Sequence, residues 1–399
     1  MNAVLVYASF APFHRSRIVA AAETGDRDGD QLTAIEIAGT QSDYRWAGSD
    51  VTGAIRSVLL FPEEDYWSIS AHRIGKMLKD RLDSIRPDVV VLPGWNFKES
   101  VAGLSWCLRN RVACVLISDS QSIDNPRGPL KELVKSCTVR RFDAAFVGGA
   151  PHVRYVGNLG IPPERCVPGC DVVDNGFFEG APRSSAAQRQ PGTGKLFSAI
   201  RLLPRKNVLG VLDTLQSTGP RWTWTVAGDG GHRDVITARV KELGLGDRVN
   251  LIGHVPYEDL PRHYASADAY LQPSLSEPWG LAVNEAMAAG LPVVVSSKCG
   301  CHEDLVRQGV NGYVFDPTAR DDLAKVLDSL WADRPRWSQM GDASRAIISD
   351  WGLRRFADGF WSACRLALAN RRGSLDRFLG LVVAGGLTLR LARTPFGIR

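Results

Sequence analysis

The stretch that decides the fold spans residues 272–296 and reads QPSLSEPWGLAVNEAMAAGLPVVVS. A short apolar run at 269–272 leads into it, another at 293–296 closes it, and a helical stretch at 281–289 lies between them. Continuous apolar strands joined by a helix indicate parallel strands that are buried on both faces. The stretch therefore predicts a strand–loop–helix–strand unit of a doubly wound sheet.

The same alternation continues on both sides of this unit. Further apolar runs of strand length lie at 4–8, 57–61, 88–92, 113–117, 144–147, 196–200, 223–227, 249–252 and 313–315. The fold class is therefore expected to be α/β, with two doubly wound, Rossmann-like parallel sheets. Ligands bind at the carboxyl ends of strands in such folds, so the site is expected in a central cleft between two facing domains.

One segment divides the alternation into two halves. Residues 180–194 read GAPRSSAAQRQPGTG and contain no large apolar residue, which is typical of a linker. A chain of 399 residues is also longer than one hydrophobic core usually supports. The predicted organisation is a domain over 1–180, a linker over 181–194, a second domain over 195–350, a helix over 351–372 that can pack back on the first domain, and a tail over 373–399.

Composition excludes several classes of protein. Hydrophobic residues make up 44% and charged residues 23% of the chain, as in globular proteins. The formal net charge is +5, and residues 371–399 alone contain six Arg and a single acid, so a nucleic-acid-binding face over the body is not expected. The first residues, MNAVLVYA, lack a basic leader, and the eight cysteines are expected to be reduced thiols of a cytoplasmic protein.

The loop and helix start within 272–296 carry the first candidate chemistry. Glu277 follows a predicted strand, and Gly280 allows backbone to approach a ligand closely. The helix that begins near Leu281 offers free N–H groups to an anion. Glu285 lies one turn later and suits a phosphate site only if it accepts hydrogen bonds from hydroxyls, such as those of a ribose. The two Glu therefore suit one ligand with hydroxyls at both ends and negative charge between them.

A second loop supplies cations. In the stretch LFSAIRLLPRKN at 196–207, Arg201 ends a predicted strand and Lys206 begins the next helix. Two cations at the carboxyl end of a strand can neutralise a diphosphate that gains charge as a glycosidic bond breaks. Arg205 lies between them and is expected to be solvated. No metal ion or other cofactor is expected, because fixed cations can do this work.

The segment from Glu277 through AGLP at 289–292, together with GYVF at 312–315, resembles the retaining glycosyltransferases of family 4, which have the two-domain GT-B fold. The resemblance covers residues 194–370 well and the first half only in general layout. It implies that the first half is the acceptor side and the second half binds a nucleotide-sugar donor. It further implies that Glu277 contacts hydroxyls of the transferred sugar and that Glu285 contacts the ribose.

The same resemblance assigns further residues to the donor. All of them lie in loops after predicted strands. Gly280 and Leu281, at a helix start, and the cations Arg201 and Lys206 would lie near the diphosphate. Gly228 lies in a Gly-rich turn, and Val255 lies in a loop around the base. The Gly-rich turn is equally typical of packing, and contact with the base would run through backbone.

The first half departs from the family pattern. Residues 9–15, SFAPFHR, contain no glycine where the family has a Gly-rich loop near the donor phosphates and the acceptor. His14 and Arg15 could instead meet an anionic acceptor or a phosphate, or could be ordinary surface residues. Asp119 follows the predicted strand 113–117 and loosely takes the place of a family histidine. Its carboxylate could accept the acceptor proton, orient the acceptor hydroxyl, or cap the next segment.

Two patterns with metal-binding residue types are set aside. The run Asp26-Arg-Asp28-Gly-Asp30 lacks the Gly and the Glu that a calcium loop of the EF-hand kind needs, so a solvated loop is expected. Cys299-Gly-Cys301-His302 has no second cluster to complete a zinc site, so ordinary packing is expected there.

The predicted function is an enzyme, a glycosyltransferase that moves a hexose from a nucleoside diphosphate sugar to a hydroxyl of a glycan or lipid-linked acceptor. Retention of configuration and a place in cell-surface polysaccharide or glycolipid synthesis are implied by the resemblance. Two alternatives stay open: a nucleotide-sugar epimerase or hydrolase on the same scaffold, and a non-catalytic nucleotide-sugar-binding protein. The sugar, the nucleotide, the acceptor and the oligomeric state are not defined at this level.

The tail over 373–399 combines basic residues with an apolar patch. Such a segment could lie on an anionic membrane, here the inner face of the plasma membrane, or pack on the domains. No stretch of the chain reaches the roughly 18 apolar residues of a membrane span.

Overall fold

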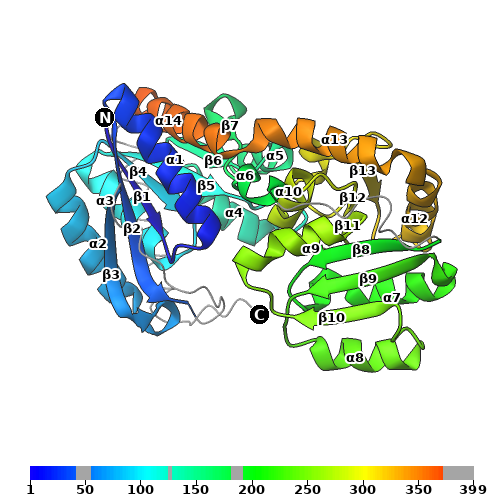
Figure 1. The fold of residues 1–399 in the computed structure, drawn as a ribbon. Helices are drawn as coiled ribbons and strands as arrows, with labels where there is room; N and C mark the ends of the chain where they lie inside the picture. Colours follow the sequence, from blue (N-terminus) through cyan, green and yellow to red (C-terminus); the bar gives the residue numbers. More distant parts are fainter. Residues whose placement is uncertain (42–54, 125–127, 181–191, 372–399) are drawn as a thin grey trace. The chain divides into compact units, whose positions relative to one another are not determined.

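The computed structural model describes residues 1–41, 55–124, 128–180 and 192–371, and the chain forms two compact units (Figure 1). The first unit comprises residues 1–122, 126–172 and 353–399, and the second comprises 123–125 and 173–352. Most of the expected linker, 181–191, and the tail from 372 onward lie outside the described residues. The linker and the membrane contact of the tail therefore stay predictions.

The first unit is built on a parallel sheet with the strand order β3-β2-β1-β4-β5-β6-β7. Its strands are β1 Asn2–Tyr7, β2 Gln31–Thr40, β3 Arg56–Asp65, β4 Val89–Pro93, β5 Ala113–Ser118, β6 Ala144–Val147 and β7 Cys166–Pro168. Its helices include α1 Pro12–Asp28, α2 Ala71–Ile85, α3 Lys98–Asn110, α4 Pro129–Val139 and α5 Ala150–Asn158. The central strands are buried on both faces, as their continuous apolar sequences predict. The strand order reverses between β1 and β4, which is where such sheets bind ligands.

Helix α14, Leu353–Ala369, belongs to the first unit although it comes last among the described helices, and it packs beside α1 (Figure 1). The indole Nε1 of Trp361 donates a hydrogen bond to the Ala21 carbonyl at 2.8 Å. The guanidinium of Arg365 pairs with Asp28 at 3.2 Å and with Asp30 at 3.0 Å. A buried aromatic face and two ion pairs thus hold the helix on this sheet.

The acidic run from Asp26 to Asp30, at the end of α1, was predicted to be a solvated loop, and the structure differs in part. Asp28 is the last residue of α1 rather than part of a loop. Asp30 is buried and pairs with the amino group of Met1 at 2.7 Å as well as with Arg365. Asp26 and Asp28 are exposed, as predicted, but both lie in the helix, and Asp30 is buried because its partners come from distant parts of the chain.

The second unit is built on a parallel sheet with the strand order β10-β9-β8-β11-β12-β13. Its strands are β8 Gly194–Ala199, β9 Trp222–Ala227, β10 Val249–Gly253, β11 Ala269–Gln272, β12 Val293–Ser296 and β13 Gly312–Phe315. Its helices include α6 Asn175–Glu179, α7 Val208–Ser217, α8 Arg233–Glu242, α9 Leu260–Ser266, α10 Leu281–Ala288, α12 Asp322–Ala332 and α13 Trp337–Ile348. The order reverses between β8 and β11, so the loops that leave these two strands lie at the switch point.

The stretch 272–296 forms the predicted strand–loop–helix–strand unit from β11 through α10 to β12. Tyr270 of β11 is the parallel partner of Val293 of β12, and Val293, Val294 and Val295 are fully buried. The prediction of two Rossmann-like parallel sheets is confirmed. In the described part of the chain, every helix is too short or too polar to cross a bilayer.

Candidate functional site

Three loops at the carboxyl ends of β8, β9 and β10 are joined by backbone hydrogen bonds. The N–H of Leu202 donates to the Asp229 carbonyl at 3.0 Å, and the N–H of Gly228 donates to the Gly253 carbonyl at 2.6 Å. Gly228 has a φ of +133°, and a Cβ at this position would overlap the carbonyl oxygen of Ile200. Glycine is therefore required at 228 for close backbone packing, and its contact with a donor stays a prediction.

The loop from Glu277 to Gly280 rests on the segment 298–301. The N–H of Glu277 donates to the Lys298 carbonyl at 3.1 Å, and the carbonyl of Glu277 accepts from the Gly300 N–H at 3.0 Å. Gly280 has a φ of +104°, and a Cβ there would lie 2.6 Å from the Cys299 sulfur. The loop is thus shaped by backbone pairing and by a glycine that no other residue replaces without strain.

The cysteines beneath this loop are part of its packing. Cys299 and Cys301 are fully buried, and the Cys299 thiol lies 2.9 Å from the carbonyl oxygen of Trp279. The indole of Trp279 donates to Asn284 at 2.9 Å and stacks on Trp351 with ring centroids 5.2 Å apart. In the described part of the chain, no group of three or more His, Cys, Asp or Glu side chains is arranged to hold a metal ion.

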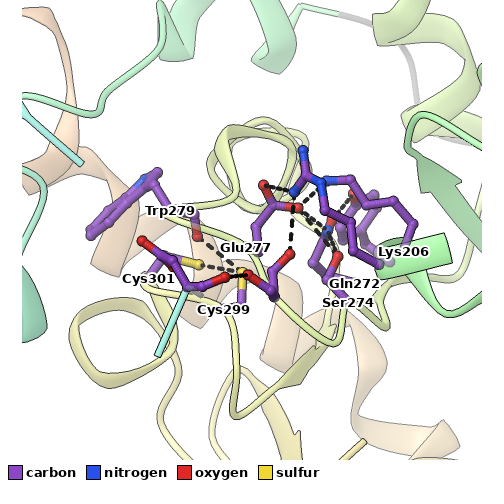
Figure 2. A network of polar contacts seen from close by, with 11 residues as sticks. Lys206, Gln272, Ser274, Glu277, Trp279, Cys299 and Cys301 are labelled. Carbon is purple, nitrogen blue, oxygen red and sulfur yellow. Dashed lines mark hydrogen bonds and ion pairs between the residues drawn. The ribbon is translucent and has the colours of Figure 1, made fainter. Parts of the chain in front are cut away.

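Figure 2 shows the polar network that surrounds the Glu277 carboxylate. The ammonium of Lys206 forms an ion pair with Glu277 Oε2. The same oxygen accepts hydrogen bonds from Gln272 Nε2 at 3.1 Å and from Ser274 Oγ at 3.2 Å. The Lys206 and Glu277 side chains are only 9% and 12% exposed, so their charges neutralise each other in a largely dehydrated place.

The loop that carries Lys206 also brings Arg205 to this network. Arg205 Nη1 lies 3.9 Å from Glu277 Oε1 and donates to the Ser276 carbonyl at 3.2 Å. Its side chain is 44% exposed. Arg205 is exposed, as predicted, and it also lies against the acidic loop. Arg201, the other predicted cation, follows β8 and is exposed.

Glu285 lies in α10 and is buried against α9. The Tyr264 hydroxyl donates to Glu285 Oε2 at 2.5 Å. Burial raises the pKa of Glu285 to about 7, although the hydrogen bond from Tyr264 opposes this rise. Gly280 is the N-cap of this helix, and Leu281 is its first residue, as predicted. The contact of Glu285 with a ribose stays a prediction.

The raised pKa of Glu285 makes stability depend on pH. Between pH 4.5 and about 7 the folded state holds a proton that the unfolded state releases. The contribution of Glu285 to the free energy of unfolding therefore falls as the pH rises. This fall in the free energy of unfolding is on the order of 3 kcal/mol at most. We expect Glu285→Gln, which stays neutral, to show a smaller fall in thermal unfolding midpoint between pH 5 and pH 8 than the wild type. Equal pH slopes for the two proteins would contradict this expectation.

The predicted residues of the first unit gather near the carboxyl ends of β1 and β5. The His14 ring stacks on Tyr7 at 4.2 Å, and its Nδ1 accepts the Ala11 N–H at 3.2 Å. Burial, and then the charge of Arg17, hold the pKa of His14 well below its usual value. A neutral ring does not attract an anion by charge, so His14 can contact a ligand only by hydrogen bonding.

Asp119 follows β5 and is exposed. Burial raises the pKa of the Tyr7 hydroxyl; the charge of Arg17 opposes this rise, and Cys170, Asp171 and, least of all, Asp119 add to it. The roles of Asp119, His14 and Arg15 toward an acceptor stay predictions.

Lys206 and Glu277 were predicted from the sequence as site residues, whereas Gln272 and Ser274 were not. Both occur in the quoted stretch, and both are fully or almost fully buried. A polar amide at the end of the predicted buried strand 269–272 was the available signal, since buried polar groups need partners.

Comparison with known proteins finds a family model that matches part of the chain. Residues 184–347 match the model of the family Glycosyl transferases group 1. The chain is 32% identical over 173 residues to O-antigen chain mannosyltransferase B of Escherichia coli, covering 42% of each chain. It is 30% identical over 165 residues to a GDP-mannose-dependent phosphatidylinositol monomannoside mannosyltransferase of Mycolicibacterium smegmatis, covering 39% of this chain and 43% of that one. The matches thus span less than half the length of either relative.

Solved structures resemble the whole fold. Anabaena HepE, crystallised with UDP and glucose, superposes with a TM-score of 0.68 at 19% identity and covers 91% of this chain and 98% of its own. WaaG, a glycosyltransferase of lipopolysaccharide biosynthesis, superposes with a TM-score of 0.64 at 17% identity and covers 94% and 100%. The fold is therefore that of the GT-B proteins.

Proposed function

Because residues 184–347 match the model of the glycosyl transferases group 1 family, we propose that the protein transfers a hexose from a nucleoside diphosphate sugar to a hydroxyl group of an acceptor. The observation that carries the proposal is the buried pair of Lys206 and Glu277 at the switch point of the second sheet. A cation and a carboxylate held side by side match a ligand that bears phosphates next to sugar hydroxyls.

The donor is proposed to lie across the loops that follow β8 and β11. Lys206 and Arg201 would neutralise the diphosphate, whose charge grows as the glycosidic bond breaks. The N–H groups at Gly280 and Leu281 would add an anion-binding helix start. Glu277 would accept hydrogen bonds from sugar hydroxyls, and Glu285 from the ribose. With these cations in place, we propose that a divalent metal is not required.

The acceptor class and the stereochemistry extend this proposal. The names of the relatives refer to an O-antigen chain and to a phosphatidylinositol mannoside, which favours a glycan or lipid-linked acceptor in cell-surface polysaccharide or glycolipid synthesis. Retention of configuration is proposed from the resemblance described above. In that case the departing phosphate oxygen would take the acceptor proton on the same face, and no nucleophilic side chain would be needed.

A panel of UDP-, GDP- and dTDP-sugars tests the proposal. We expect one nucleotide class to raise the thermal unfolding midpoint of the purified protein and to be released as the diphosphate when an acceptor is present. Release without any acceptor would favour the hydrolase alternative, and binding without release would favour a non-catalytic binding protein. If no member of the panel binds, the donor assignment is wrong.

A further inference from the structure

We propose that Gln272 and Ser274 are positioning residues: they hold the Glu277 carboxylate in place while Lys206 is engaged by the donor diphosphate. This inference rests on the proposed function, because it concerns the same site. It assigns a role to two side chains to which the proposed function gives none.

Three donors converge on a single carboxylate oxygen. Glu277 Oε2 receives the Lys206 ammonium, the Gln272 amide at 3.1 Å and the Ser274 hydroxyl at 3.2 Å (Figure 2). An ionised carboxylate can only accept hydrogen bonds, so the amide group that faces it is the NH₂ end. One charged donor and two neutral donors therefore share the same acceptor.

The neutral donors are fixed by further hydrogen bonds and by burial. Gln272 is the last residue of β11, and its carbonyl Oε1 accepts the Tyr270 hydroxyl at 2.7 Å. Its Nε2 also lies 2.9 Å from Ser274 Oγ. Tyr270 and Ser274 are completely buried, and Gln272 is 1% exposed. Lys206, by contrast, reaches Glu277 with a long side chain that has several rotatable bonds.

In the proposed reaction, Glu277 and the donor diphosphate compete for the charge of Lys206, and the two neutral donors compensate Glu277 for the loss. Lys206 cannot give its full charge to Glu277 and to a diphosphate at the same time. A largely buried carboxylate that loses its counter-ion is costly unless other hydrogen bonds replace it. Gln272 and Ser274 supply these bonds without moving, so Glu277 stays oriented toward the sugar after Lys206 turns to the phosphates.

The test compares a nucleotide sugar with the same nucleotide lacking the sugar. The variants are Gln272→Met, which keeps the length of the side chain, Ser274→Ala, and the double variant. Tyr313→Phe is the matched control, because it removes a hydroxyl hydrogen bond to Asp333 in the same unit but outside this network. Affinities for GDP-mannose and GDP, or for UDP-glucose and UDP if the wild type prefers that pair, are measured by calorimetry, together with kcat and KM.

We expect Gln272→Met to weaken binding of the nucleotide sugar and to lower kcat about tenfold, and the double variant to approach a hundredfold, since hydrogen bonds to charged groups have this size. Affinity for the nucleoside diphosphate should fall less, by about threefold, because this ligand also draws Lys206 away from Glu277 but lacks the sugar that the oriented carboxylate holds. Tyr313→Phe should resemble the wild type in every assay.

Two results would overturn the inference. Equal losses for the nucleotide sugar and for the nucleoside diphosphate would show that the variants merely damage the unit. Unchanged kcat and affinity in the double variant would show that Glu277 needs no such support. A wild-type protein that binds neither member of either pair would instead refute the proposed function itself, so the two failures are distinguishable.

Discussion

Replacing Lys206 by alanine is expected to lower kcat/KM for sugar transfer by about 10²–10³-fold, the loss that follows removal of one preorganised group that stabilises developing charge. Lys206 is buried, and its ammonium is paired with Glu277. In the proposed reaction this charge faces the departing diphosphate. Initial rates over a range of donor concentrations measure the effect.

The same substitution also leaves the buried Glu277 without its counter-ion, so loss of folding must be separated from loss of catalysis. The double variant Lys206→Met with Glu277→Gln removes both charges and should recover most of the thermal stability without recovering turnover. Arg205→Ala is the matched control: its guanidinium is 44% exposed and 3.9 Å from Glu277, and we expect less than about a tenfold loss. A Lys206→Ala enzyme within threefold of the wild type would contradict the assignment.

Replacing Gly228 by alanine is expected to destabilise the second unit by about 3 kcal/mol, among the larger effects of a single substitution. The backbone at 228 has a φ of +133°, and the added Cβ would overlap the carbonyl oxygen of Ile200, which is backbone and cannot swing away. The loops after β8 and β9 would have to separate. Thermal or urea unfolding of the purified protein measures the loss.

Gly231 provides the control within the same turn. A Cβ at this position would meet nothing within 4 Å, and the residue is exposed. Gly231→Ala should therefore change the unfolding free energy by about 0.5 kcal/mol or less. If the two alanine variants unfold at the same midpoint, the close approach at Gly228 is not what holds these loops together.

The buried strands were the most predictable part of the fold. β4, β5 and β12 are continuous apolar runs, and such runs are buried on both faces wherever the sheet places them. β2 and β7 were not predicted. β2 carries Glu36 within its apolar run, and β7 has three residues, so neither shows a clear periodic pattern. Both became strands because a neighbouring strand paired with them.

The candidate site also has one part that was predicted from the sequence and one part that was not. Glu277, Gly280 and the start of α10 were predicted because they are close in sequence, where the order of strand, loop, glycine and helix follows from local chemistry. Lys206 and Glu277 lie 71 residues apart, in loops that leave β8 and β11. They meet because those two strands are neighbours in the sheet and because the Leu275 N–H donates to the Arg205 carbonyl at 2.8 Å.

The order of amino acids was thus sufficient for the alternation of buried strands and helices and for the residue types of the acidic loop, because periodicity and loop chemistry are local properties. Which donors share Glu277 Oε2 was settled by packing in three dimensions. Convergence of Lys206, Gln272 and Ser274 on one oxygen depends on strand neighbours and on burial, and neither can be obtained from spacing along the chain.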